Sequence, residues 1–403
     1  MHMTSFTLNK RTVVFIFALL SVVMAAGILS VSAPLYAQGE RAFFTPREDF
    51  RVFYIASELI NVGRPADIYQ PALFLKRLSQ ELGHEGIFAW FYPPPYLLVL
   101  QPLSWLSLKN AYFVSIVLQW ALFLSVTYRF LWKRPLEALA LSSPVMFMAF
   151  GWGQNGVLMA ILYLGAFRFL KICPLLSGFF FGCCVIKPHL GVLLPVFLLA
   201  GRHYKSCLAA CLTAVLLGVV SWFLYGTTPW LLYGHMLVDN FIGSTKALGI
   251  GNIMGIFPIP TVGKMMLSFG VSAALAKLVQ LLVFAYCFYQ ICNAKRDGWS
   301  QKPLVAAVYF SLLSLLAIPY FNLYDYVFAV SAALGLVLAA PENKHFDLRL
   351  VVGLLLVFFI PVIHMTSIRL TGFIITPLLM GLFYLQLRCH PEYLPEVGAT
   401  NLA

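Results

Sequence analysis

Two ionisable residues stand where they could take part in a reaction. Asp49 lies in Glu48-Asp49-Phe50-Arg51, just after the first apolar segment, and Lys187 precedes Pro188 between two later apolar segments. A carboxylate can accept a proton from a reacting hydroxyl, and a cation in a low-dielectric setting can stabilise a departing anion. Ordinary structural explanations also exist. Asp49 could cap a helix, and Lys187 could extend its ammonium group toward a membrane surface.

Further polar residues stand at the ends of apolar segments. Charged groups at membrane depth are energetically costly and indicate function by default. Gln154 and Asn155 could instead satisfy a helix start, and Asp325 could form a structural ion pair with Lys187 or Arg369. The sequence contains no HExxH, paired-cysteine or clustered-acid pattern and no phosphate-binding glycine motif, so we expect neither a metal nor a cofactor.

The composition indicates which elements position these residues. Of the 403 residues, 61% are hydrophobic and only 10% are charged, whereas soluble domains have about 45–50% and about 25%. So few polar residues could not cover the surface of a soluble fold. We therefore predict an all-α polytopic membrane protein with about 11–12 transmembrane helices. This class excludes soluble enzymes, disordered chains and small disulfide scaffolds.

A single integral membrane domain, 1–403, accounts for the order of segments. The first span is predicted at 12–34, although a cleaved signal peptide is a competing interpretation. A large outer loop follows at 35–108, with short helices near 50–61 and 71–82 and a proline-rich half-helix that begins at Tyr92. Helical spans at 109–226 and 271–388 flank a second outer loop at 227–270, and 389–403 forms a cytoplasmic tail. Segments of about 20 apolar residues suffice to span a bilayer.

The charges support this arrangement. The chain carries 27 basic and 15 acidic residues, a formal net charge of +12. With the amino terminus inside and the proline-rich run not crossing, most basic clusters fall on the cytoplasmic side, as such clusters usually do. The unusual polar residues then collect on the opposite face. We therefore expect a site that faces away from the cytoplasm.

Several segments in the same order resemble glycosyltransferase family 87, which is related to α-1,2-mannosyltransferases that use polyprenyl-phosphate-mannose. No single motif is specific, but together they cover approximately residues 45–340. The segments are Asp49 to Ala56, Asp67-Ile68-Tyr69, Phe91 to Tyr96, Gly153-Gln154-Asn155-Gly156, Gly182 to Pro188, Pro319-Tyr320 and Tyr324-Asp325-Tyr326.

The resemblance implies a GT-C fold and transfer of a sugar from a lipid-phosphate donor, generally with inversion at the anomeric carbon. Asp49 matches the acid of the family, and we expect it to act as general base. Lys187 matches the family's lysine before proline, and we expect it to bind the donor phosphate, assisted by Arg51 or Arg369. The expected substrate-binding residues are Asp67, Tyr92, Tyr96, Gln154, Asn155, His189, Tyr324 and Asp325.

The expected partners are a polyprenyl-phosphate-linked donor, carrying mannose or another hexose, a lipid or glycan acceptor and the bilayer, but no nucleic acid. The expected location is the plasma membrane, with the site on the periplasmic or other extracytoplasmic face. Two alternatives remain at this point. One is a membrane transporter or lipid-linked sugar flippase, and the other is a different lipid-linked transferase, such as a polysaccharide ligase or polymerase.

Overall fold

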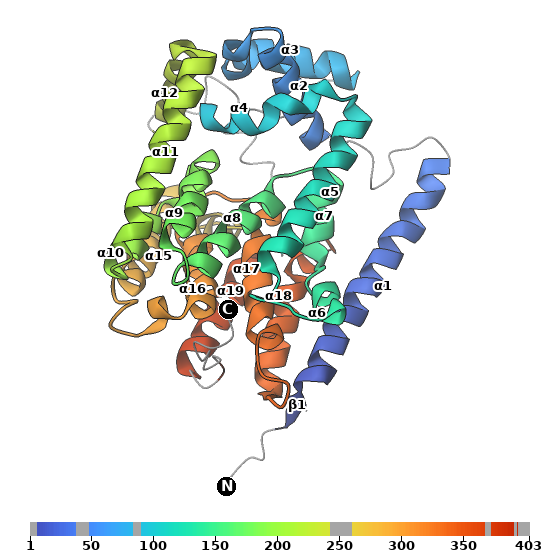
Figure 1. Cartoon of the computed structure of the whole chain (residues 1–403), viewed down its shortest axis with the longest axis vertical. Helices are drawn as coiled ribbons and strands as arrows, with labels where there is room; N and C mark the ends of the chain where they lie inside the picture. Colours follow the sequence, from blue (N-terminus) through green and yellow to red (C-terminus); the bar gives the residue numbers. More distant parts are fainter. Residues whose placement is uncertain are drawn as a thin grey trace.

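The computed structural model describes residues 6–37, 48–83, 90–241, 260–366, 372–390 and 393 (Figure 1). Within these ranges the fold is almost entirely helical, which confirms the predicted all-α membrane class. The strands described are β1 (Thr7–Asn9) and β2 (His345–Asp347), which pair antiparallel and hold the two chain segments together at one end of the molecule. Arg369 lies outside the described residues.

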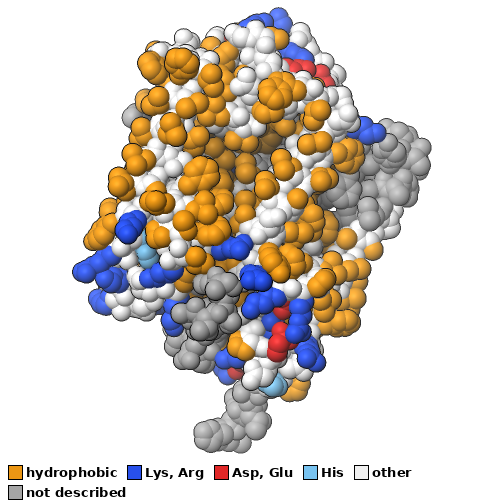
Figure 2. Space-filling view, in the orientation of Figure 1, with side chains coloured by type: hydrophobic (Ala, Val, Ile, Leu, Met, Phe, Trp, Pro, Cys, Tyr) orange, Lys and Arg blue, Asp and Glu red, His pale blue; other side chains and the backbone are white. Residues whose placement is uncertain are grey.

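Four of the described helices are long and apolar enough to cross a bilayer. They are α1 (Lys10–Ala37), α5 (Leu108–Thr127), α11 (Tyr204–Tyr225) and α15 (Ala273–Cys292). Their outer faces carry exposed apolar side chains; Leu212 of α11, for example, is 62% exposed and Phe223 82%. Figure 2 shows such side chains spread over the flank of the molecule. A surface of this kind is stable against lipid and not against water.

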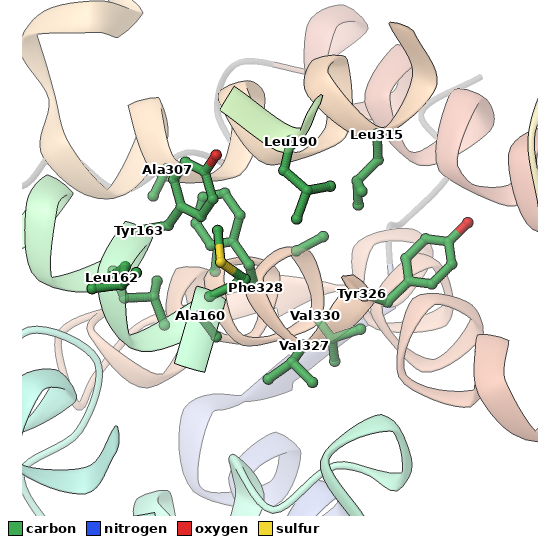
Figure 3. Close-up of a cluster of buried hydrophobic side chains, with 14 of the residues drawn as sticks. Ala160, Leu162, Tyr163, Leu190, Ala307, Leu315, Tyr326, Val327, Phe328 and Val330 are labelled. Carbon is green, nitrogen blue, oxygen red and sulfur yellow. The ribbon is translucent and has the colours of Figure 1, made fainter. Parts of the chain in front are cut away.

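Shorter apolar helices fill the centre of the bundle. α8 (Gly156–Phe169), α16 (Pro303–Ala317) and α17 (Tyr326–Leu338) are buried on nearly all sides. Figure 3 shows part of their shared core, where the rings of Tyr163 and Phe328 stack with centroids 4.7 Å apart. The remaining helices of the transmembrane layer are α6 (Pro135–Ala140), α7 (Pro144–Trp152), α14 (Val262–Ser268), α18 (Leu348–Thr366) and α19 (Gly372–Cys389).

Two half-length helices form a hairpin within this layer. They are α9 (Pro174–Cys183) and α10 (Leu194–Ala200), joined by the 3-10 turns η3 (Cys184–Ile186) and η4 (Pro188–Gly191). A Cβ atom at Gly178 would lie 2.5 Å from the Ser206 carbonyl oxygen, and one at Gly182 would lie 2.6 Å from that of Ala210. Small residues four apart allow helix backbones to approach this closely.

The direction of the hairpin follows from these contacts. The contact positions advance together along α9 and α11, so the two helices run parallel, and α10 between them must run back. Within the predicted span region 109–226, α9 and α10 are therefore the two arms of a hairpin, since ten residues rise only about 15 Å. Lys187 lies at the hairpin tip, because it joins η3 to η4.

An outer layer covers one end of the bundle, at the top of Figure 1. It consists of α2 (Glu48–Asn61), η1 (Pro65–Tyr69), α3 (Pro71–Leu82), α4 (Pro94–Leu100), η2 (Gln101–Trp105) and α12 (Thr227–Phe241). The short helices predicted near 50–61 and 71–82 are thus present. The proline-rich run forms α4, whose seven residues are too few to cross a bilayer.

The opposite end gathers charged side chains. Lys10 is buried there, with its Nζ 2.8 Å from Glu137 and 3.2 Å from Glu342. Arg388, at the end of α19, lies 2.9 Å from Asp297, which follows α15. Figure 2 shows basic side chains clustered at this end, near β1. The separation of this end from the outer layer agrees with the topology expected from the charge distribution.

Candidate active site

Five segments that are distant in the sequence meet beneath the outer layer. They are the start of α2 with Asp49, the segment before α4 with Tyr92, the turn 153–156 between α7 and α8, the tip of the α9–α10 hairpin, and the 3-10 turn η6 (Leu323–Asp325) before α17. We call this region the outer recess. It contains most of the residues that the sequence singled out.

Two glycines hold the turn 153–156 against its neighbours. Gly153 has φ +68°, a left-handed conformation that favours glycine, and a Cβ there would lie 2.5 Å from the Cβ of Phe50. At Gly156, a Cβ would lie 2.1 Å from the carbonyl oxygen of Tyr324. The first contact brings α2 and the neighbouring Asp49 to the turn, and the second brings η6 to it.

Lys187 is tied to both sides of the recess. Its Nζ lies 2.6 Å from Oδ1 of Asp325 and donates to Oδ1 of Asn155 at 3.2 Å. It also lies 4.6 Å from the centre of the Tyr324 ring. The side chains of Lys187 and Asp325 are 3% and 0% exposed. A cation and a carboxylate this deeply buried are stable only as a pair, because either alone would lack solvation. The ion pair that the sequence left as one alternative is therefore formed.

The local sequence around η6 orients Asp325. The second carboxylate oxygen, Oδ2, accepts a hydrogen bond from the backbone amide of Asn322 at 3.0 Å. The side-chain amide of Asn322 donates to the Tyr324 hydroxyl at 2.7 Å. Both carboxylate oxygens are thus occupied, which fixes the rotamer. Asn322 was not predicted as a site residue, although an asparagine three residues before an acid at a helix start is a recognisable capping signal.

The hairpin tip lies below the level of the outer layer. Gly182 contacts Thr213 of α11, and α11 continues for twelve residues to Tyr225, a rise of roughly 18 Å. Lys187 comes only five residues after Gly182. Lys187 is therefore recessed by roughly 10 Å from the outer end of α11, and α4 contacts η3, the turn just before Lys187.

Aromatic side chains form the upper wall of the recess. The Tyr92 hydroxyl lies 3.5 Å from Oε1 of Gln154, and the Tyr92 ring lies 4.7 Å from that of Tyr96 and 5.2 Å from that of Trp90. Trp90 and Tyr96 are only 3% and 2% exposed, so they pack inside this cluster. Tyr92 is half-buried and borders the recess more directly.

The electrostatics of Tyr92 relate the two acids of the recess. Burial raises the pKa of the Tyr92 phenol well above its usual range, and Tyr96 adds to this effect. The negative charges of Asp325 and Asp49 raise the pKa further, because each disfavours a second anion nearby. Geometry places Asp49 here independently, because its neighbour Phe50 packs against Gly153 in the turn 153–156.

The other predicted residues lie in different places. His189 lies at the hairpin tip; its ring centre is 5.7 Å from that of Tyr320, and its Nε2 is enclosed without a hydrogen-bond partner among the described residues. Arg51 pairs with Glu81 of α3 at 2.8 Å. Asp67 pairs with Arg64 in η1, at the other end of α2.

The recess offers a limited set of chemical groups. Within the described part of the chain, no three His, Cys, Asp or Glu side chains cluster as a metal site would require. The groups present are the carboxylate of Asp49, the paired charges of Lys187 and Asp325, and several amides and phenols. Such a set can move one proton and can stabilise one anion.

Comparison with known proteins agrees with this chemistry. Residues 90–253 match the model of glycosyltransferase family 87. The matched range includes Tyr92, Asn155 and Lys187, whereas Asp49 and Asp325 lie outside it. The chain matches no curated protein and no solved structure. The family match confirms the resemblance seen in the sequence, and it favours an enzyme over a transporter. The chain is therefore a membrane glycosyltransferase that is similar to family 87 over residues 90–253.

Proposed function

We propose that this glycosyltransferase moves mannose or another hexose from a polyprenyl-phosphate-linked donor to a lipid or glycan acceptor, with inversion at the anomeric carbon. The observation that carries the proposal is the outer recess itself, where the turn 153–156 meets both Phe50, the neighbour of Asp49, and the buried ammonium group of Lys187. One group suits the incoming nucleophile, and the other suits the leaving phosphate.

The proposed step is a single displacement. The acceptor hydroxyl oxygen forms a bond to the anomeric carbon while the bond from that carbon to the phosphate oxygen breaks. The hydroxyl proton passes to the carboxylate of Asp49, and the bonding electron pair leaves with the polyprenyl phosphate. General base catalysis of this kind contributes typically 10²–10⁴-fold. Inversion follows because the acceptor attacks from the side opposite the phosphate.

Lys187 suits the leaving phosphate because of its partners. An ammonium group has three N–H donors, and two of them are directed to Asp325 and Asn155. The third can donate to a phosphate oxygen. Asp325 keeps the buried lysine charged and oriented, but it also cancels much of the positive charge. Nε2 of His189 at the same tip, which has no partner among the described residues, supplies a second donor when that nitrogen carries a proton.

The location in the membrane supports a lipid-linked donor. The hairpin tip lies roughly 10 Å below the outer end of α11, a depth that a phosphate on a prenyl chain can reach from within the bilayer. A nucleotide sugar would have to enter from water. We further propose that the recess opens to the extracytoplasmic face of the plasma membrane, because the basic clusters lie at the opposite end of the molecule.

The test is transfer of labelled mannose from polyprenyl-phosphate-mannose to a membrane lipid extract by the purified protein. Asp49→Asn should lower the rate by about 10²–10⁴-fold without a loss of folding, because the substitution is nearly isosteric. Glu58→Gln is the matched control. Glu58 lies on the same helix and pairs with Arg77 at 2.6 Å while partly exposed, so its effect should be small.

Wild-type rates in Asp49→Asn protein would remove Asp49 from the role of base. Failure of mannose transfer by the wild type would lead to the same assay with polyprenyl-phosphate-linked glucose and galactose. If an intact oligosaccharide were transferred instead of a single hexose, the ligase or polymerase alternative would replace this proposal.

A further inference from the structure

A second concavity lies in the outer layer, apart from the outer recess. It is an open cavity of about 460 Å³ at the place where η1, the start of η2 and the junction of α11 with α12 meet. Ligand-binding clefts commonly have volumes of about 300–1,000 Å³. Ile60 of α2 lines it, and eleven residues of helix separate Ile60 from Asp49, a rise of roughly 16 Å. We call it the outer cavity.

The polar groups of the outer cavity suit a neutral ligand that carries hydroxyls. Its charged lining residues, Arg64 and Asp67, form an ion pair with each other, so the lining has no net charge to attract a phosphate. The Tyr225 hydroxyl donates to Oε1 of Gln101 at 2.9 Å. The side-chain amide nitrogen of Gln101 has no hydrogen-bond partner among the described residues and can donate to a ligand.

Accessibility agrees with this interpretation. The Asp67 side chain is 17% exposed, whereas that of Arg64 is 62% exposed. The carboxylate is thus held at the cavity wall, and its remaining lone pairs can accept hydrogen bonds from sugar hydroxyls. Thr228, an exposed residue of α12, also lines the cavity. A carboxylate, an amide and a hydroxyl around one hollow are the groups that hydrogen-bond a polyol.

Aromatic contacts connect the outer cavity to the outer recess. Tyr69 of η1 lies 6.4 Å from Trp90, measured between ring centres, and Trp90 lies 5.2 Å from Tyr92. Tyr69 also lies 6.2 Å from Tyr233 of α12. One packed aromatic cluster therefore joins η1, whose first residues line the outer cavity, to Tyr92 at the outer recess.

We propose that the outer cavity binds sugar residues of the acceptor that lie behind the reacting hydroxyl. This inference rests on the proposed function, and it selects a glycan or glycolipid acceptor over a simple lipid, which has no hydroxyls to place there. Occupation of the cavity would hold the acceptor while its terminal hydroxyl reaches Asp49. Its residues should therefore govern acceptor binding and not the chemical step.

The experiment measures binding of mannotriose, maltotriose and cellotriose to the purified protein in lipid nanodiscs by saturation-transfer NMR, with glycerol as the comparison. We expect at least one trisaccharide to bind the wild type and to bind at least tenfold more weakly to Asp67→Asn and to Gln101→Ala. Lys76→Gln, on the exposed face of α3, is the control and should bind as the wild type does. Thermal unfolding verifies that each variant is folded; Arg64 is largely exposed, so Asp67→Asn should fold.

The transfer assay separates this proposal from the proposed function. With a glycan acceptor, Asp67→Asn should raise the acceptor KM at least tenfold while kcat and the donor KM stay within twofold. Asp49→Asn should lower transfer by about 10²–10⁴-fold and keep trisaccharide binding. If no trisaccharide binds the wild type, or if the cavity variants bind as it does, the cavity assignment is wrong even where transfer is observed. If binding weakens as expected but no polyprenyl-phosphate hexose is used, the donor assignment is wrong and the cavity assignment stands.

Discussion

The buried ion pair between Lys187 and Asp325 makes a quantitative prediction. At 2.6 Å, their gross Coulomb attraction is roughly 6 kcal/mol with an effective dielectric constant of about 20. Replacing Asp325 by asparagine leaves the buried ammonium without a counter-charge, which typically destabilises by 3–5 kcal/mol. The lysine could instead lose its proton. That loss at pH 7, starting from an ordinary lysine pKa of about 10.4, costs about 4–5 kcal/mol. We therefore expect Asp325→Asn to lower the free energy of unfolding by about 3–5 kcal/mol.

A double variant distinguishes the pair from its separate members. In Lys187→Met with Asp325→Asn no buried charge remains, and methionine fills irregular apolar space well, here beside the Tyr324 ring. Stability should therefore recover to within about 1–2 kcal/mol of the wild type. Transfer activity should not recover, because no cation is left for the leaving phosphate. Stability and activity would thus respond differently to the same pair of changes.

Unfolding of the purified protein in mixed micelles with a rising fraction of SDS measures the free energies, and transfer from the polyprenyl-phosphate donor measures activity. The four proteins form a double-mutant cycle, whose coupling energy should be at least about 2 kcal/mol. An Asp325→Asn protein within about 1 kcal/mol of the wild type would refute the reasoning. A double variant that is as unstable as the single Asp325→Asn protein would also refute the reasoning.

The remaining predictions concern packing and pH. Gly156→Ala should destabilise the protein by about 1–3 kcal/mol and lower transfer at least tenfold, because the new Cβ would lie 2.1 Å from a backbone oxygen. Gly234→Ala is the control, because a Cβ there would have no atom within 4 Å. In the same unfolding and transfer assays it should be neutral or slightly stabilising. Gly182→Ala should also lower transfer, because it separates α9 from α11 and displaces the hairpin tip; normal activity in either of these two variants would contradict the tight packing. Partial burial alone would raise the pKa of the Glu342 carboxyl, but its hydrogen bond to Lys10 and the nearby positive charges lower the pKa below its usual range. The contribution of this carboxylate to stability is therefore fully present above the unfolded-state pKa of about 4.3 and is lost as pH falls through the lowered folded-state pKa. Glu342→Gln should unfold more easily than the wild type at pH 7, and as easily as the wild type at a pH below both pKa values. The same stability difference at both pH values would contradict this assignment.

Local patterns were sufficient for much of the fold. The helices α2 and α3 were predictable, since each is a short amphipathic stretch. Prolines also mark the first residues of η1 and α3. The seven-residue α4 followed from the consecutive prolines. Within the predicted span region 109–226, the short apolar runs of α9 and α10 are compatible with one bent span or with the two arms of a hairpin. Only the contact of Gly182 with α11 decides between them.

The site was predictable as a set of residues and not as a set of contacts. Asp49, Asn155, Lys187 and Asp325 were recognised from the order of motifs, and the structure brings them into one recess. The pairing of Arg51 with Glu81 of α3 is one contact that no local pattern predicted. Asn322 was missed, although it orients Asp325 through a short-range capping contact.

By itself, the sequence determined the class of this protein and the positions of most helices. Composition decides these properties because hydrocarbon tolerates only apolar, internally hydrogen-bonded segments, and because helix signals act within a few residues. The tertiary structure decided which groups neutralise one another. Lys187 and Asp325 are 138 positions apart, and their pairing depends on close glycine contacts of two different helices, α8 and α9. Such contacts depend on the packing of whole helices, which no local pattern contains.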